Sequence, residues 1–140
     1  MRRPLAALVA ALLTTTVASA QSYPGDPGVG VERGIQELNN SGQVGSVTLF
    51  RRDPNTRFAV ILHGTIPGRA QSVRVYRGPS CDDLGTAAPT YFLTDMKSGA
   101  SSTIVKALES KLLSGNYNVV VFSSTAPGAQ ATACGHLYAS

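Results

Sequence analysis

The sequence predicts an all-β protein, an antiparallel sandwich or barrel of about seven or eight strands. Short runs of β-branched and aromatic residues recur along the chain, and most of them alternate apolar with polar side chains. Turn residues separate the runs, and the chain contains 14 Gly and 8 Pro. Helical segments of about 10–15 residues are missing between the runs, which argues against a parallel sheet with crossover helices.

The first 20 residues have the pattern of a secretory signal peptide. Arg2 and Arg3 precede the apolar run 5–13, and Ala18-Ser19-Ala20 has the small-x-small form of a cleavage site. An N-terminal anchor helix is the alternative, but the apolar run is short for a membrane span. We therefore expect an exported protein, periplasmic or secreted, without a transmembrane segment after cleavage.

The mature chain is expected to form one weakly basic domain. Removing two of the 12 basic residues with the signal peptide leaves a net charge of +2 against the 8 acidic ones. Residues 21–28 carry two Pro and two Gly without apolar periodicity, and we expect a flexible lead-in. Residues 29–140 are enough for a single domain with its own core. The small charge, the compartment and the lack of Trp argue against nucleic acid as a partner.

The first two strands are expected to form a hairpin. Apolar residues alternate with others over residues 29–35, and again over 46–50 after turn residues at 39–42. A short helix over residues 32–39 is the competing interpretation.

The next strand, residues 57–64, is expected to be buried on both faces. It follows a turn at Asp53-Pro54-Asn55, and it is apolar on both sides of the strand alternation. His63 shares one face of this strand with Ala59 and Ile61, so we expect a partly buried, hydrogen-bonded histidine.

The remaining candidate strands are residues 72–77, 90–96, 117–123 and 131–138. Between them, residues 101–113 are ambiguous. Ile104, Leu108 and Leu112 have helical spacing, whereas the β-branched residues early in the segment favour a strand. We expect a strand and then a turn.

Cys81 and Cys134 are the only cysteines of the chain. In an exported protein, two cysteines form a disulfide more often than a metal or redox site. We expect such a bond to join two strands that are distant in the sequence.

Four segments together resemble a known family: residues 78–85, 98–105, 112–122 and 133–135. In their order and spacing they resemble small exported bacterial proteins related to copper/zinc superoxide dismutases and CHRD-type domains. The Cys-x-x-Leu-Gly and Ala-Cys-Gly elements are the most specific, and the resemblance covers about residues 29–138. It implies a Greek-key β-sandwich in which a Cys81–Cys134 bridge matches the family's intrachain disulfide.

The metal ligands of that family are missing here. The family carries a His-x-His pair on the strand before the Gly-x-x-Cys segment and another His at the end of the Tyr-x-x-x-Val strand, because imidazole nitrogens suit copper and zinc. The matching residues here are Arg74, Tyr76 and Phe122, and the family's active-site Arg matches Ala131. Arg stays protonated and Phe has no ligand atom. We expect no metal and no cofactor at these former metal-site positions.

The strand alternation suggests what replaces the metal site. Arg74 and Tyr76 share one face of their strand, and Phe122 shares a face of its own strand with Val120. If the family geometry holds, Arg74, Tyr76 and Phe122 converge as a plug with a cation–π contact. The alternative is a solvated Arg74, with both rings packed elsewhere.

Basic residues are concentrated between positions 51 and 77. They are Arg51, Arg52, Arg57, Arg69, Arg74 and Arg77, and Asp53 is the only acid among them. Such a region is a candidate anion-binding face for an anionic surface or an acidic polysaccharide. The alternative is that arginines at strand edges and turns prevent edge-to-edge aggregation.

These observations leave two classes of function. We favour an exported, non-catalytic scaffold that has lost its metal ligands and that binds an anionic partner through its Arg-rich face. The alternative is a metal-binding protein or dismutase-type enzyme with a rebuilt site. That site would need His63, His136, Asp82, Asp83 or Asp95, and their spacing matches no known catalytic or metal motif.

Overall fold

The computed structural model describes residues 29–82 and 88–138, so the expected signal peptide (1–20) and lead-in (21–28) lie outside the described residues. Within them the chain forms eight strands and one short helix. The strands are β1 Val31–Glu37, β2 Val44–Arg52, β3 Asn55–His63, β4 Gln71–Arg77, β5 Tyr91–Met96, β6 Ala100–Val105, β7 Tyr117–Phe122 and β8 Ala131–His136, and the helix is α1 Glu109–Ser114.

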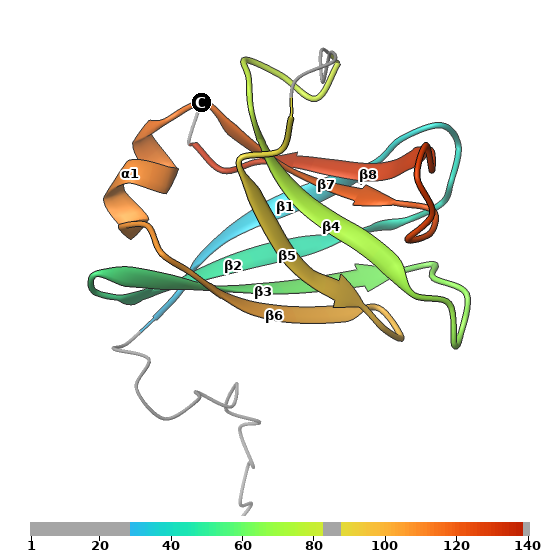
Figure 1. Ribbon diagram of the computed structural model, residues 1–140, viewed down its shortest axis with the longest axis horizontal. Coiled ribbons are helices and arrows are strands. Elements are labelled where there is room, and N and C mark those ends of the chain that lie inside the picture. The colour runs from blue at the N-terminus through green and yellow to red at the C-terminus, as the bar shows by residue number, and fades with distance from the viewer. Residues whose placement is uncertain (1–28, 83–87, 139–140) are drawn as a thin grey trace, which may run out of the picture.

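The strands pair antiparallel in the order β5-β4-β7-β8-β1-β2-β3-β6, which confirms the predicted fold class. The sheet bends into two layers, with β1, β2, β3 and β6 in one and β5, β4, β7 and β8 in the other (Figure 1). A short β1–β8 ladder at Gln36 and Glu37 joins the layers on one side. On the other side, the amide of Thr94 in β5 donates a 2.7 Å hydrogen bond to the Thr103 hydroxyl of β6. The result is a nearly closed barrel.

The connections are of the Greek-key type. β4, β5 and β6 follow one another along the chain, but β7 then pairs with β4 and not with β6. β3 likewise pairs with β6 across the intervening strands. A strand that returns to lie beside the first of three consecutive strands defines a Greek key.

Alternate residues of the strands point into the barrel, and most of these inward side chains are branched aliphatic groups. Among the side chains less than 2% exposed are Ile35, Val47, Leu49, Val60, Val73, Val75, Val119, Val121 and Leu137. Fully burying a residue of this kind stabilises the fold by roughly 1.5–3 kcal/mol. The barrel interior is therefore a packed core, and the functional surface must lie on its outside.

The first hairpin is confirmed, and the competing helix over residues 32–39 is wrong. β1 pairs with β2 over five residue pairs, from Val31 with Leu49 to Ile35 with Gly45. Val47 and Leu49 face inward on β2, which places Val31 and Ile35 on the core side of β1. A helix would have broken this alternation.

The ambiguous segment is a strand followed by a short helix, where a turn was expected. Ile104 is 52% exposed in β6, and Leu108 is 46% exposed just before α1, whereas Leu112 in α1 is fully buried. The three residues with helical spacing therefore do not share one face. Burial of Leu112 against the core stabilises the extra helical turn.

The expectation that β3 is buried on both faces is wrong. Ile61 is 53% exposed on the outer face of this strand, and His63 at its end is exposed rather than partly buried. Arg57 shares the outer face and is only 5% exposed. Because one face of β3 forms part of the outside of the barrel, only the side chains on its inward face reach the core.

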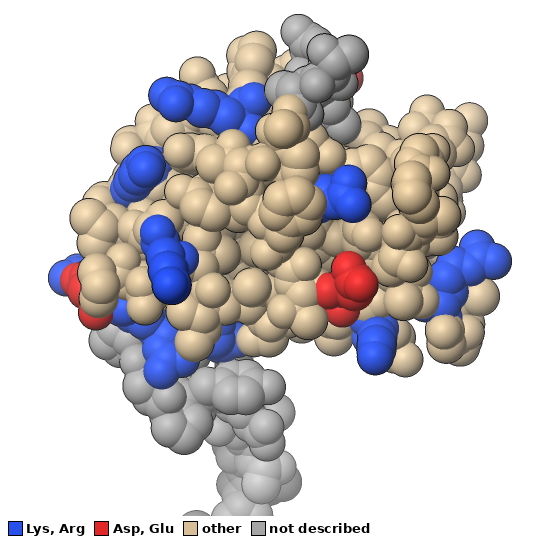
Figure 2. Space-filling model, in the orientation of Figure 1, with Lys and Arg blue, Asp and Glu red and all other residues tan. Residues whose placement is uncertain are grey.

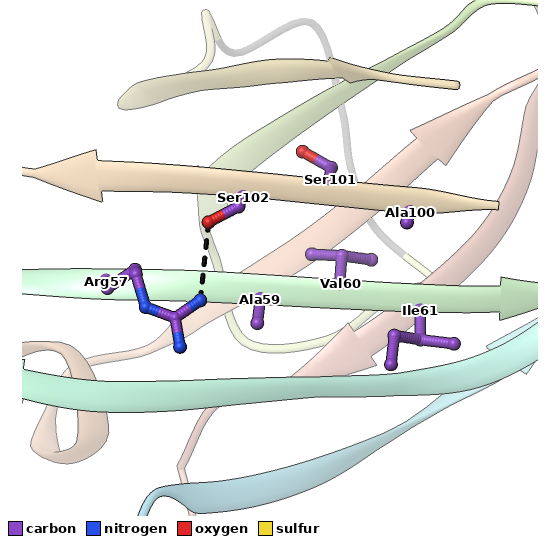
Figure 3. A pocket seen from close by; sticks show the side chains of 7 residues that line it. All are labelled: Arg57, Ala59, Val60, Ile61, Ala100, Ser101 and Ser102. Atoms are coloured by element: carbon purple, nitrogen blue, oxygen red, sulfur yellow. Dashed lines mark hydrogen bonds between the residues drawn. The ribbon is translucent and has the colours of Figure 1, made fainter. Parts of the chain in front are cut away.

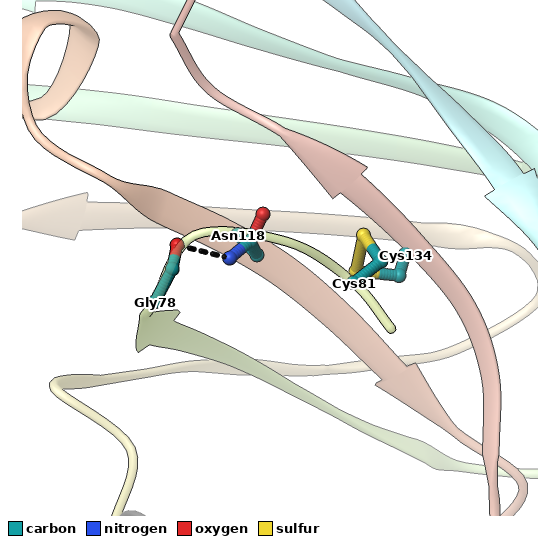
Figure 4. Close-up of a disulfide and its surroundings, with 4 residues drawn as sticks. All are labelled: Gly78, Cys81, Asn118 and Cys134. Carbon is teal, nitrogen blue, oxygen red and sulfur yellow. Dashed lines mark hydrogen bonds between the residues drawn. A yellow bond between two sulfur atoms is a disulfide. The ribbon is translucent and has the colours of Figure 1, made fainter. Parts of the chain in front are cut away.

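The predicted disulfide is present, but it does not join two strands. Cys134 lies in β8, whereas Cys81 lies in the loop after β4, which ends at Arg77. Gly78 and Pro79 follow that strand, and Pro cannot donate to a strand ladder, so Cys81 comes after the strand has ended. The bond ties this loop to the outer face of β8 (Figure 4).

Across residues 29–82 and 88–138, no helix has the length and apolar character that crossing a membrane requires.

A close approach of β2 and β3 requires glycine at position 45. A methyl group on Gly45 would collide with the main-chain carbonyl oxygen of Ile61. Gly34 offers a matched control, because the nearest atom to an added methyl group there is the flexible end of Gln36, at 3.7 Å.

We expect Gly45→Ala to lower the free energy of unfolding by about 2 kcal/mol or more, because the ladder must shift to make room. Gly34→Ala should be neutral or stabilising by up to about 1 kcal/mol. Urea unfolding followed by circular dichroism measures both. Equal losses in the two variants would contradict this account of β2–β3 packing.

The disulfide closes a loop whose ends are 53 residues apart in the sequence. On the chain-entropy model, such a link stabilises the fold by about 4 kcal/mol. We expect Cys81→Ser/Cys134→Ser to lose a comparable amount in urea unfolding, and reduced wild-type protein to match the variant. A loss below about 1 kcal/mol would show that the bond contributes little.

Candidate anion-binding site on the outer face of β4 and β7

The candidate site begins with the alternation of β4. Val73 and Val75 point into the core, so Ser72, Arg74 and Tyr76 lie on the outer face of the barrel. In the ladders, Arg74 stands opposite Phe92 of β5 on one side and opposite Val120 of β7 on the other. Arg74 therefore lies on the outer face of the sheet, in the middle strand of β5, β4 and β7.

Two aromatic rings hold the Arg74 side chain. Its Cζ lies 5.3 Å from the ring centroid of Phe122 in β7 and 5.5 Å from that of Phe92 in β5. Tyr76 packs at a tilt against Phe122, with ring centroids 6.3 Å apart. Arg74, Tyr76 and Phe122 thus lie together, as expected from the strand alternation combined with the family geometry. Their role as former metal-site positions stays a prediction.

A second apolar cluster supports these rings from outside the barrel. Tyr76, Val120 and Cys134 are its buried members, and the half-buried residues packed against them are Leu38, Cys81, Phe122 and Ala131. The disulfide belongs to this outer cluster. This outer cluster covers a face of β7 and β8 that would otherwise be exposed to water.

The loop that carries Cys81 is also fixed by a hydrogen bond. Asn118 in β7 is fully buried, and its Nδ2 donates a 2.9 Å hydrogen bond to the carbonyl oxygen of Gly78 (Figure 4). Among the described residues, Asn118 Oδ1 and its cross-strand neighbour His136 Nδ1 are buried without a hydrogen-bond partner. The outer cluster is therefore held by both a covalent and a polar link.

A hollow of about 190 Å³ opens beside Arg74. Its lining consists of Ser72, Arg74, Phe122, Ser124, Ala126, Gly128 and Ala129. The last four come from the loop between β7 and β8, and the amide of Ser72 donates a 3.4 Å hydrogen bond to the carbonyl oxygen of Ser124. The residues around the hollow thus include one cation, two serines and one aromatic residue.

The six arginines of the predicted anion-binding face are spread over the molecule. Arg51 and Arg52 lie at one end of the β2–β3 hairpin, and Arg69 lies in the loop beyond the other end of β3. The nine residues of β3 span the distance between these two ends, which is therefore about 25–30 Å. On the face shown in Figure 2, Lys and Arg side chains form separate patches divided by uncharged surface.

The individual environments of these arginines also differ. Arg51 forms an exposed ion pair of 2.7 Å with Asp53, and Arg77 is exposed at the end of β4. Arg57 is buried, its Cζ 4.3 Å from the Phe50 ring centroid and its Nη1 3.3 Å from the Ser102 hydroxyl. Of the six, Arg74 is the one that lines the hollow beside Phe122.

A second hollow, of about 380 Å³, lies between β3 and β6 (Figure 3). Arg57 reaches toward Ser102 at one end, and Ala59, Ile61 and Ala100 line the rest. The small side chains of Ala59 and Ala100 leave this space open beside the exposed Ile61. It is mostly apolar, and its one charged group is already engaged with Ser102.

The titratable residues of the alternative, rebuilt site lie on different elements. His63 ends β3, His136 ends β8, Asp95 is in β5 and Asp82 follows the disulfide, while Asp83 lies outside the described residues. Within residues 29–82 and 88–138, no three His, Cys, Asp or Glu residues are grouped so that they could hold a metal ion.

Sequence reasoning missed Phe92, Ser72 and Ser124 as members of the site. Phe92 and Ser72 stand in recognised candidate strands, but their position beside Arg74 depends on the β4–β5 and β4–β7 registers, which the sequence pattern does not set. Ser124 belongs to a loop whose only sequence signal is its turn composition.

Comparison with family models, with curated proteins and with solved structures gives no match to this chain.

The two rings beside Arg74 should differ in their contribution to stability. Phe122 packs against the outer cluster, whereas Phe92 is 67% exposed. We expect Phe122→Ala to lower the free energy of unfolding by about 2 kcal/mol or more, and Phe92→Ala by less than about 1 kcal/mol. Urea unfolding of both variants measures the difference. A larger loss for Phe92→Ala would contradict the described packing.

Proposed function

We propose that this chain is an exported, non-catalytic β-barrel that binds an anionic group of its partner in the hollow beside Arg74. The observation that carries the proposal is the position of Arg74, between two rings and at the wall of a cavity. Of the six arginines in the predicted anion-binding face, the proposal assigns anion binding to Arg74 alone. It rests on chemistry at this hollow and not on net charge.

The surroundings of Arg74 favour binding of an anion over a purely structural role. A guanidinium is always protonated in proteins and presents several N–H donors in a rigid plane that matches a carboxylate or phosphate. Contacts with ring faces leave its N–H donors available, because a ring accepts no strong hydrogen bond. Ser72 and Ser124 line the same hollow, and a serine hydroxyl can donate a further hydrogen bond to an anion.

The same lining argues for binding and against catalysis. Its side chains are one arginine, one phenylalanine, two serines and small aliphatic residues. A serine needs an adjacent base to act as a nucleophile, and none of these side chains is a base near neutral pH. The hollow therefore offers attraction and hydrogen bonds, without a group that exchanges protons with a substrate.

The proposed history of the site follows from the resemblance to superoxide dismutase-like and CHRD-type proteins. On that resemblance, Arg74, Tyr76 and Phe122 stand where metal-binding histidines would be. We propose that loss of those ligands turned a cation site into an anion site on the same outer face. The disulfide and the signal-like N-terminus fit an exported protein.

The test uses Arg74→Gln, which keeps most of the side-chain length and removes the charge. We expect wild-type protein to bind acetate and inorganic phosphate, and Arg74→Gln to bind them about 10- to 100-fold more weakly, since a hydrogen bond to a charged group contributes about 1.5–3 kcal/mol. Amide chemical shifts followed through a titration measure the affinity.

The matched control is Arg69→Gln, in the exposed loop between β3 and β4. This substitution removes one positive charge, as Arg74→Gln does, but Arg69 does not line the hollow. The Arg69→Gln variant should therefore bind both anions with wild-type affinity. Equal weakening in the two variants would indicate non-specific attraction by net charge. Unchanged binding in Arg74→Gln would refute the site.

A further inference from the structure

We propose, building on the proposed function, that the occupant of this site is a carboxylated sugar ring of an acidic polysaccharide. In this arrangement the carboxylate binds Arg74 and the apolar face of the pyranose ring lies on Phe92. The inference adds a second contact point to the anion site. It also assigns a role to Phe92, which the fold itself does not explain.

Phe92 is a poor candidate for a purely structural residue. It is 67% exposed on the outer face of β5, and its ring is the less buried of the two beside Arg74. A single exposed aromatic residue is common on protein surfaces and needs no explanation by itself. What points to a ligand is its place directly opposite the cation that lines the hollow.

The spacing of the two groups fits a ring that carries a carboxylate. The centroid of the Phe92 ring lies 5.5 Å from Arg74 Cζ. In a hexuronic acid the carboxylate is bonded directly to the pyranose ring, so one ligand can reach both groups at once. The C–H groups of a pyranose face are apolar and slightly positive, which matches the negative face of an aromatic ring.

The size of the hollow selects against larger or more apolar ligands. Small-molecule pockets usually have volumes of about 300–1,000 Å³, and this hollow has about 190 Å³. It can hold one functional group or part of one sugar, while the rest of a polymer must run along the surface. The loop on its other side contributes Ser124, Ala126, Gly128 and Ala129, which offer hydrogen-bonding groups but little area for an acyl chain.

Hydroxyl groups around the site suit the remaining polar groups of a sugar. Ser72 and Ser124 line the hollow, and Thr94 lies two residues beyond Phe92 on the same outer face of β5. Thr94 is exposed, and its own amide is already engaged with Thr103 of β6. Hydroxyl side chains can both donate and accept, so they can pair with sugar hydroxyls in either sense.

The experiment compares glucuronate, acetate and glucose as probes on the folded protein. We expect wild-type protein to bind glucuronate about 10-fold more tightly than acetate and to bind glucose too weakly to measure. Because Phe92 also contacts Arg74, the readout is the ratio of the two affinities within one variant, and Phe92→Ala should bring the ratio of glucuronate to acetate affinity down to about one. Phe92→Leu, which keeps apolar area but lacks the ring face, should retain only part of the advantage.

The controls separate the two proposals. Ile61→Ala removes a comparably exposed apolar side chain on β3, which β6 separates from β5 and which does not line the hollow beside Arg74, and this variant should bind glucuronate like the wild type. If Phe92→Ala binds glucuronate as tightly as the wild type while Arg74→Gln still loses acetate, the sugar inference is wrong and the anion site stands. If Arg74→Gln loses neither ligand, both proposals are wrong. Binding of phosphatidylglycerol vesicles that depends on Arg74 and Phe92, without glucuronate binding, would replace the sugar by a lipid surface.

Discussion

The two-residue alternation of β4 and β7 is the constraint on which the site depends. Because Val73, Val75, Val119 and Val121 must fill the barrel, their neighbours in the sequence are forced outward. A one-residue shift of β4 would turn Arg74 toward the core, and a one-residue shift of β7 would turn Phe122 toward it. The packing of the core therefore determines which side chains are available for binding, although none of the core residues takes part in it.

The outer cluster fixes the positions of the side chains on that exposed face. The disulfide and the Asn118–Gly78 hydrogen bond hold a loop over β7 and β8, so Tyr76 and Phe122 have apolar neighbours on the outside of the barrel. The Phe122 ring, fixed in this way, contacts the Arg74 guanidinium and holds it in place before a ligand arrives. A binding group that is already ordered loses less conformational entropy on association.

The sequence predicts the strands well where alternation or β-branched content is strong, as in β1, β2 and β7, and it predicts the disulfide from two cysteines. It does not distinguish a turn from α1, because burial of Leu112 depends on the rest of the fold. Arg74 and Tyr76 could be placed on one face from alternation alone, whereas their convergence with Phe122 was expected only from the family resemblance. Phe92 and Ser124 could not, because their contact with the site depends on strand register and on the path of a loop.

The most direct test of the account is to observe the Arg74 side chain itself. The Nε–H signals of the arginines can be followed by nuclear magnetic resonance while glucuronate is added to the folded protein. We expect the Arg74 signal to shift in a saturable manner, while those of Arg69 and Arg77 remain unchanged. Saturable shifts at Arg69 or Arg77 with an unmoved Arg74 signal would contradict the central claim.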